Sequence, residues 1–297
     1  MTEPLLYESH CHTPLCKHAI GDPSEYAQVA LNRGLKGMIV TCHNPMPNGF
    51  SAAVRMAESE FDRYVQWVGQ TAELWKGRLD VRLGLEADYF VGHESYVQRQ
   101  LEHTDFQFVL GSVHPQISEY RERFWHPDPL QVQRIYFQHL AASAETGLFD
   151  SLAHPDLIKN FTASAWHPDE MMPDILRALD RIAATGTAME LNTSGLLKTI
   201  PEMNPFPEML VEISKRGIPI TLGADAHEPD RVGAGFIQAL RLLRECGFAD
   251  VSLFLERKRQ PISIDLAIAS LSPADMTNGS ITDSRHVGSG STNQADR

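Results

Sequence analysis

Residues 37–43 read GMIVTCH, a short apolar run that ends in a histidine. A run of this length is typical of a buried β-strand. The pattern recurs at 219–227, PITLGADAH, where an aspartate and a histidine follow the apolar residues. Longer stretches with helical spacing of apolar residues separate such runs. The sequence therefore predicts strands that alternate with helices, with polar side chains at the end of each strand.

The same alternation extends over most of the chain. Strands are expected at 5–9, 37–42, 81–86, 106–113, 150–153, 187–191, 219–223 and 251–255, and helices at 23–33, 52–75, 94–102, 129–146, 168–184, 207–216 and 229–246. Such alternation implies parallel pairing with helical crossovers. Seven or eight units in about 270 residues favour one closed α/β barrel, TIM-like in architecture, over two separate domains.

The end of the chain differs in composition from the rest. Residues 272–297 are poor in large apolar side chains and rich in Ser, Thr, Asn, Gly and Asp. We therefore divide the chain into a barrel domain at 1–271 and a C-terminal tail at 272–297, for which we expect disorder. His286, in this tail, is not expected to take part in chemistry.

Charge and cysteine content narrow the class of protein. The chain has 297 residues, with 26 Lys and Arg against 38 Asp and Glu, a formal net charge of −12. Long nucleic acid is an unexpected partner for an acidic protein, whereas a small phosphorylated substrate is compatible. No stretch approaches the ~20 apolar residues of a membrane span, and no signal-peptide pattern begins the chain. Four cysteines without CxxC spacing indicate free thiols and a cytoplasmic location. No feature assigns an oligomeric state.

Histidines and acidic residues collect at the ends of the predicted strands. These residues are His10, His12, His43, Glu86, His114, His154, Glu190, Asp225 and His227. In a barrel of parallel strands, the C-terminal ends converge on the face where active sites are built. His, Asp and Glu are ligands of zinc, iron and manganese. Without a cation, so many ionisable groups on one face would repel each other or lose solvation.

The number of candidate ligands exceeds one tetrahedral site. Nine side chains qualify: His10, His12, His18, His43, Glu86, His114, His154, Asp225 and His227. A cluster of two or three divalent ions is the economical interpretation. Because side chains alternate along a strand, Cys11 and Cys42 are interpreted as packing residues rather than ligands. The other histidines of the barrel domain (His93, His103, His126, His139 and His167) are expected in solvated or capping positions.

Seven motifs in order along the chain resemble those of one known family. They are HCHTPLCKHA at 10–19, VTCHNPMP at 40–47, GLEADY at 84–89, GSVHPQ at 111–116, AHPDLIK at 153–159, ELNTSG at 190–195 and GADAHEPDRVG at 223–233. Together they resemble the PHP (polymerase and histidinol phosphatase) superfamily, and in particular its histidinol-phosphatases of histidine biosynthesis. The resemblance spans about residues 10 to 233, and its motifs are far more specific than one H-x-H pair.

The resemblance implies a distorted (β/α)7 barrel with a trinuclear metal site of zinc, iron or manganese. It would place one ion between His10, His12, Glu86 and Asp225, and a second at Glu86, His114 and His154. A third would be held by His18, His43 and His227. Cys42 departs from the superfamily, many members of which have an acidic residue there, but it is not an implied ligand.

The implied reaction is hydrolysis of L-histidinol phosphate to L-histidinol and phosphate. We hypothesise attack of a metal-activated hydroxide on phosphorus, with Asp225, Glu86 and His227 as catalytic residues. Asp225 or a metal-bound water would protonate the leaving alkoxide. Lys159 is the first candidate to bind the phosphate, followed by Arg231 and Lys17. Glu190 and Asn192 could recognise histidinol, although Glu190 could equally orient a metal-binding histidine.

Three other functions fit parts of the pattern. A PHP phosphoesterase could act on a nucleotide or a sugar phosphate. An amidohydrolase-like barrel also carries H-x-H after its first strand, but it typically needs a lysine or glutamate bridge at strand four, where this chain has His114. The third alternative is a non-catalytic metal-binding module, but such a module would not need the full set of ligands that this chain carries.

Overall fold

Seven parallel strands form the centre of the molecule in the order in which they occur along the chain. The computed structural model describes residues 3–271, so the predicted tail at 272–297, with His286, lies outside the described residues. The strands are β1 (Tyr7–Cys11), β2 (Gly37–Val40), β3 (Asp80–Asp88), β4 (Phe108–Ser112), β5 (Ser151–Leu152), β6 (Ala188–Asn192) and β7 (Ile220–Gly223). Backbone hydrogen bonds of 2.9 Å from His12 to Ala226 and from Ala226 to His10 join the last strand to the first. The predicted barrel of seven units is confirmed.

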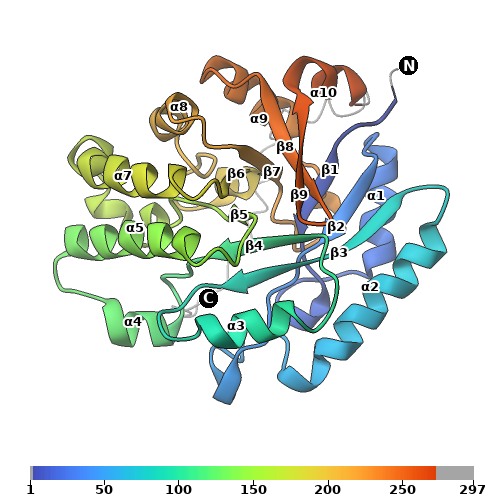
Figure 1. Cartoon of the computed structure of the whole chain (residues 1–297), viewed down its shortest axis with the longest axis horizontal. Helices are drawn as coiled ribbons and strands as arrows, with labels where there is room; N and C mark the ends of the chain where they lie inside the picture. The colour runs from blue at the N-terminus through green and yellow to red at the C-terminus, as the bar shows by residue number, and fades with distance from the viewer. Residues whose placement is uncertain (1–2, 272–297) are drawn as a thin grey trace, which may run out of the picture.

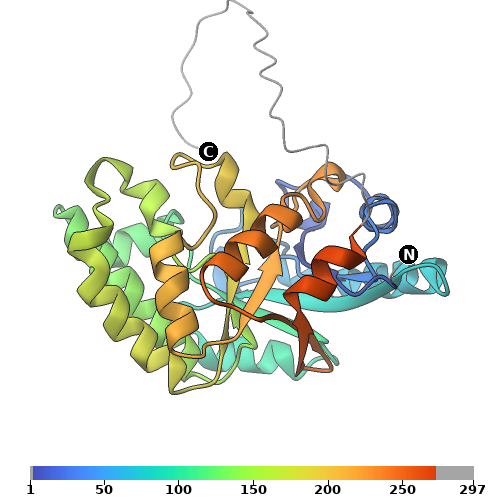
Figure 2. The ribbon, with the colours of Figure 1, turned by 90° about the horizontal axis from the view of Figure 1, so that it is seen from above.

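Helices surround the strands (Figures 1 and 2). They are α1 (Pro23–Asn32), α2 (Phe61–Trp75), α3 (Glu94–Leu101), α4 (Ser118–Phe124), α5 (Pro129–Glu145), α6 (Ile158–Phe161), α7 (Pro168–Ala183), α8 (Pro207–Lys215), α9 (Phe236–Glu245) and α10 (Ile264–Ser270). The capping of α1 follows its sequence signal, because the Asp22 carboxylate accepts a hydrogen bond of 2.8 Å from the Ser24 amide. Among residues 3–271, no helix combines the length and apolar character that a membrane crossing requires.

The predicted last strand does not join the barrel. Instead, β8 (Asp250–Leu255) pairs antiparallel with β9 (Lys258–Ser263) in a separate hairpin, which Figure 1 shows in red. The Phe254 ring stacks on Phe108 of β4 with centroids 5.5 Å apart, and Arg257 forms an ion pair of 3.0 Å with Asp150. The hairpin therefore contributes apolar side chains to the barrel core without adding a strand.

Two predicted helices are shorter than expected. Helix α2 starts at Phe61 rather than at residue 52, because the preceding segment turns inward and buries Arg55 against Asp88, with 2.6 Å between Nη2 and Oδ2. Helix α9 starts at Phe236 rather than at residue 229, because Gly233 and Gly235 have φ angles of +69° and +78°, outside the right-handed helical region. Both segments lie after strands whose ends carry candidate ligands.

Candidate metal centre

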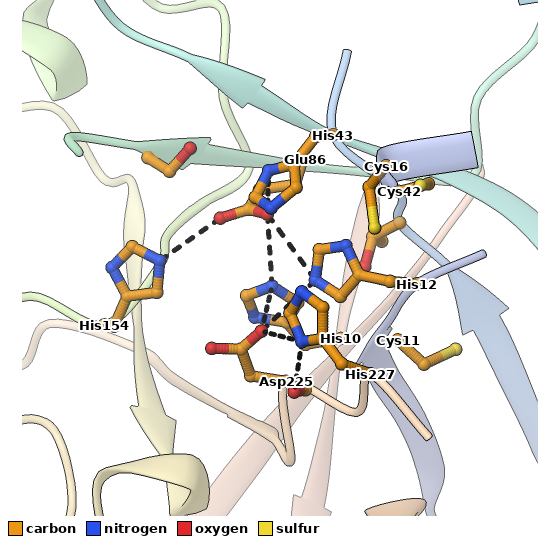
Figure 3. A network of polar contacts seen from close by, with 12 residues as sticks. His10, Cys11, His12, Cys16, Cys42, His43, Glu86, His154, Asp225 and His227 are labelled. Atoms are coloured by element: carbon orange, nitrogen blue, oxygen red, sulfur yellow. Dashed lines mark hydrogen bonds and ion pairs between the residues drawn. The ribbon is translucent and has the colours of Figure 1, made fainter. Parts of the chain in front are cut away.

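Glu86, at the end of β3, is the centre of the polar cluster (Figure 3). Its side chain is fully buried, and its two oxygens face different groups. Oε2 lies 3.4 Å from His10 Nε2 and 3.6 Å from His12 Nε2, whereas Oε1 lies 3.2 Å from His154 Nε2 and 3.5 Å from His114 Nε2. A carboxylate divided in this way can bridge two cations.

Asp225, just after β7, faces the same two histidines of β1. Its Oδ1 lies 3.5 Å from His10 Nε2 and 3.2 Å from His12 Nε2. The structure therefore brings together the four residues of the first predicted site. Backbone torsions with φ of +50° at Asp225 and +30° at His154 are unfavourable for residues with a Cβ, and such strain is common at functional sites.

The third predicted group lies beside the first. The His18 and His227 rings are 4.5 Å apart between centroids, and His18 and His43 are 5.4 Å apart. His18 is exposed at this edge of the cluster. Nitrogens of His12, His43 and His227 also lie within 4.8 Å of one another. All nine predicted ligands thus meet in one place, drawn from the ends of strands and the loops that follow.

Carboxylates outside the cluster fix the orientation of two histidines. Glu190 Oε1 lies 2.7 Å from His10 Nδ1, and Asp88 Oδ1 lies 3.0 Å from His114 Nδ1. The buried Arg55 guanidinium in turn holds Asp88. Such partners direct the other ring nitrogen toward a metal. Of the two roles considered for Glu190, the contact supports orientation of a histidine.

Asn192 also contacts residues that support the cluster, and it does not line an open pocket. It is completely buried, and its amide donates a hydrogen bond of 2.9 Å to Glu190 Oε2. Its own oxygen accepts the Ser194 hydroxyl at 2.7 Å. Asn192 therefore contacts groups that hold His10 and Asp225, and the predicted role in histidinol recognition is not supported by its position.

The chemistry of the donor atoms fits divalent cations. Several buried atoms of the cluster lack a hydrogen-bond partner: His10 Nε2, His43 Nδ1, Glu86 Oε2 and His227 Nε2. His43 Nδ1 and Glu86 Oε2 are 2.8 Å apart but do not have hydrogen-bond geometry. Buried polar atoms left unpaired are costly, and a cation would satisfy them together.

Protonation states also favour metal ligation. Burial would raise the pKa of Glu86, but His43 and His10 hold the pKa well below its usual value. Asp225 behaves in the same way beside His10 and His12. Burial lowers the pKa of His43 to about 4 and that of His227 well below 6.5. At neutral pH the centre therefore offers ionised carboxylates and the neutral imidazoles of His43 and His227. Burial would lower the pKa of His10, His12 and His114, but nearby carboxylates raise it, to about 9 for His12, so a cation would have to displace a proton from these rings.

Lys159, the first candidate to bind phosphate, does not face the cluster. It is completely buried, and its ammonium lies 2.9 Å from Asp156 and 3.0 Å from Glu202. It also donates to the Met203 carbonyl oxygen at 2.9 Å. The charge of Lys159 is balanced by two carboxylates, and its contacts join the loop at 202–203 to α6. Its position therefore does not support the predicted role in phosphate binding.

Three other cations lie near the strand ends. Lys17 is exposed and donates to the carbonyl oxygen of Ala52, and Arg231 is half-buried near the carboxylates of Glu8 and Glu228. Lys198, which sequence reasoning missed, lies 3.9 Å from Asp225 Oδ2 and is 29% exposed. Its only signal in the sequence is its place in the loop after β6.

Gly223, at the end of β7, allows Glu190 to reach His10. A Cβ at this position would lie 2.2 Å from Glu190 Oε1 and 2.6 Å from His10 Cβ. We expect Gly223→Ala to destabilise the protein by about 1–3 kcal/mol and to weaken metal binding, because both side chains must move. Chemical denaturation and metal titration measure the two effects.

Gly69→Ala is the matched control for this prediction. Gly69 lies within α2 with open space around its missing Cβ, so the substitution is expected to stabilise by roughly 0.5–1 kcal/mol. Unchanged metal binding and stability in Gly223→Ala would contradict the close packing described above.

Comparison with known proteins now identifies the family. The PHP domain family matches residues 8–194. The chain belongs to the PHP domain family. A protein named probable histidinol-phosphatase, from Deinococcus radiodurans, is 41% identical over 266 residues, which cover 86% of this chain and 99% of that protein. The histidinol-phosphatase of Bacillus subtilis is 24% identical over 77% of this chain and 96% of its own length.

A solved structure has the same fold. The histidinol phosphate phosphatase of Lactococcus lactis, complexed with zinc, L-histidinol and phosphate, superposes with a TM-score of 0.73 at 20% identity. The match covers 86% of this chain and 98% of that structure. The family and the barrel predicted from the sequence are therefore confirmed.

Proposed function

We propose that this PHP chain is a metal-dependent phosphomonoesterase that hydrolyses L-histidinol phosphate to L-histidinol and phosphate in histidine biosynthesis. The observation that carries this proposal is the convergence of seven histidines around the carboxylates of Glu86 and Asp225. Similarity over nearly the whole length of a relative named for this activity supports the choice of substrate.

The proposed cofactors are two or three divalent ions, of zinc, iron or manganese. The first would be held by His10, His12, Glu86 and Asp225, the second by Glu86, His114 and His154, and the third by His18, His43 and His227. When bound, such ions supply a nucleophilic water at neutral pH and stabilise charge on the phosphoryl oxygens. The Glu86 carboxylate has one oxygen on each side and would connect the first two sites.

The two oxygens of Asp225 face different groups, one the histidines of the cluster and the other the loop after β6. Its Oδ1 faces the histidines, while its Oδ2 accepts the Ser194 hydroxyl at 3.1 Å. Because its pKa is held well below its usual value, Asp225 stays ionised, which suits it to bind a cation rather than to donate a proton to the leaving alkoxide. The leaving alkoxide then takes its proton from water, the second of the two alternatives considered.

Lys198 replaces Lys159 as the proposed partner of the phosphate. We expect Lys198→Ala to lower kcat/KM for histidinol phosphate about 10–100-fold, because a charge-assisted hydrogen bond contributes about 1.5–3 kcal/mol. Lys198→Arg should keep most of the activity, and Lys215→Ala, at an exposed lysine of α8, is the control. Wild-type kinetics in Lys198→Ala would return the assignment to Arg231 or Lys17.

The substrate is tested by phosphate release from a panel of phosphomonoesters. The metal-loaded chain is assayed with L-histidinol phosphate, nucleoside monophosphates, sugar phosphates and p-nitrophenyl phosphate. We expect the highest kcat/KM for histidinol phosphate. Faster cleavage of a nucleotide or a sugar phosphate would favour the alternative PHP activity, and no cleavage with zinc, iron or manganese would favour a non-catalytic module.

Location and partners follow the same proposal. The four cysteines are free and buried, which suits a reducing cytoplasm. A small phosphorylated substrate, rather than long nucleic acid, suits the net charge of −12.

A further inference from the structure

The His12 ring has one nitrogen at the proposed metal centre and one that lacks a partner. Its Nε2 lies 3.2 Å from Asp225 Oδ1, whereas its Nδ1 is buried without a hydrogen-bond partner. The side chain is only 1% exposed, so bulk solvent does not reach this nitrogen. The two nitrogens of an imidazole point in different directions, so one cation cannot satisfy both. A donor left unpaired in the interior is costly, so this nitrogen is expected to have an acceptor nearby.

Two cysteine sulfurs lie beside this ring. A His12 nitrogen and the sulfurs of Cys16 and Cys42 lie within 4.8 Å of one another, and Figure 3 shows both cysteines on the opposite side of His12 from His154. Cys42 is therefore not only the packing residue that strand alternation predicts. Cys11 does fit that prediction, because its thiol faces the Ile39 carbonyl oxygen at 3.6 Å.

Cys42 already accepts polar hydrogens. The Thr13 amide and hydroxyl lie 3.4 Å and 3.3 Å from its sulfur in donor geometry. Because Cys42 is completely buried, bulk solvent cannot take the place of its sulfur as the acceptor for these two donors. In two other histidines of the cluster, Nδ1 has a carboxylate acceptor. This acceptor is Glu190 for His10 and Asp88 for His114.

We propose that the Cys42 sulfur accepts the Nδ1 proton of His12 and is a positioning residue for metal binding. A ring held in this way presents the Nε2 lone pair to the cation that Asp225 and Glu86 face. The proposal rests on the metal centre proposed above. It gives this chain a sulfur acceptor behind His12, where His10 and His114 have carboxylates.

The test measures zinc affinity of the full-length protein by chelator competition. We expect Cys42→Ala to bind zinc about 10–100-fold more weakly, the usual effect of removing such a partner. Cys42→Ser should recover part of the loss, because a hydroxyl also accepts a hydrogen bond. Cys246→Ala, at a buried thiol that faces the Pro207 carbonyl oxygen, is the control and should match the wild type.

Three results would overturn the inference. One is wild-type zinc affinity in Cys42→Ala. Another is an equal loss of zinc affinity in Cys42→Ala and Cys42→Ser, accompanied by lowered thermal stability of both variants in excess chelator. That result would indicate that Cys42 acts only in packing. The third is a sulfur-to-metal charge-transfer band in the cobalt-loaded wild type, lost in Cys42→Ala, which would make the sulfur a ligand. Failure of the wild type itself to bind zinc would instead overturn the proposed metal-dependent function.

Discussion

Glu86→Ala is expected to reduce phosphate release from histidinol phosphate by at least about 10³-fold, equivalent to about 4 kcal/mol of lost transition-state stabilisation. Glu86 has one oxygen toward His10 and His12 and the other toward His114 and His154. Its removal takes a ligand from two of the proposed ions at once. Metal analysis should show fewer ions per chain, and steady-state kinetics should show the loss mainly in kcat.

The matched control for this variant is Glu73→Ala, which removes an exposed carboxylate of α2. Its activity and metal content should equal those of the wild type. Circular dichroism and thermal unfolding in excess chelator establish whether Glu86→Ala keeps the fold. A folded Glu86→Ala protein that retains most of its turnover would contradict the role of Glu86 as a shared ligand.

Removal of divalent ions is expected to abolish activity and to lower the thermal stability. At free metal 100 times above Kd, each bound ion stabilises the folded protein by about 2.7 kcal/mol. For a domain of this size, 1 kcal/mol corresponds to a shift in Tm of about 2–4 °C, so stripping should lower Tm by several degrees. Differential scanning calorimetry and phosphate release, before and after chelation, measure both effects.

Adding metal ions back to the stripped protein distinguishes the loss of the ions from damage to the protein. Zinc, iron and manganese are returned separately, and at least one should recover both Tm and turnover. Unchanged turnover in protein with less than one ion in ten chains, confirmed by elemental analysis, would contradict metal-dependent catalysis.

The cluster of candidate ligands at the strand ends was predictable because of how parallel strands assemble. Residues such as His43, Glu86 and His114 follow apolar runs, and the ends of parallel strands in a barrel must converge. The number of such residues at strand ends therefore predicts a cluster from the sequence alone. Strand ends can be located from short stretches of sequence, so this prediction does not depend on the conformation of the loops.

Predictions about loop residues were less successful, because a loop side chain is directed by contacts distant in sequence. Lys159 follows the candidate ligand His154 by five residues, yet its ammonium lies in the interior beside Glu202 and Met203, which are more than 40 residues away. Lys198 comes near Asp225 because of the loop after β6, and its sequence neighbours give no sign of this. The helix predicted from residue 52 starts only at Phe61, because the Arg55 guanidinium pairs with Asp88 in the interior.

By itself, the sequence determined the alternating units, the barrel and the set of acidic and histidine side chains at its C-terminal face, since periodicity and strand ends are local properties. Only the tertiary structure decided that β8 and β9 form a separate hairpin, that Glu190 and Asp88 orient His10 and His114, and that the Cys42 sulfur lies close to the His12 ring. These outcomes depend on packing between segments far apart along the chain, which no short window of residues contains.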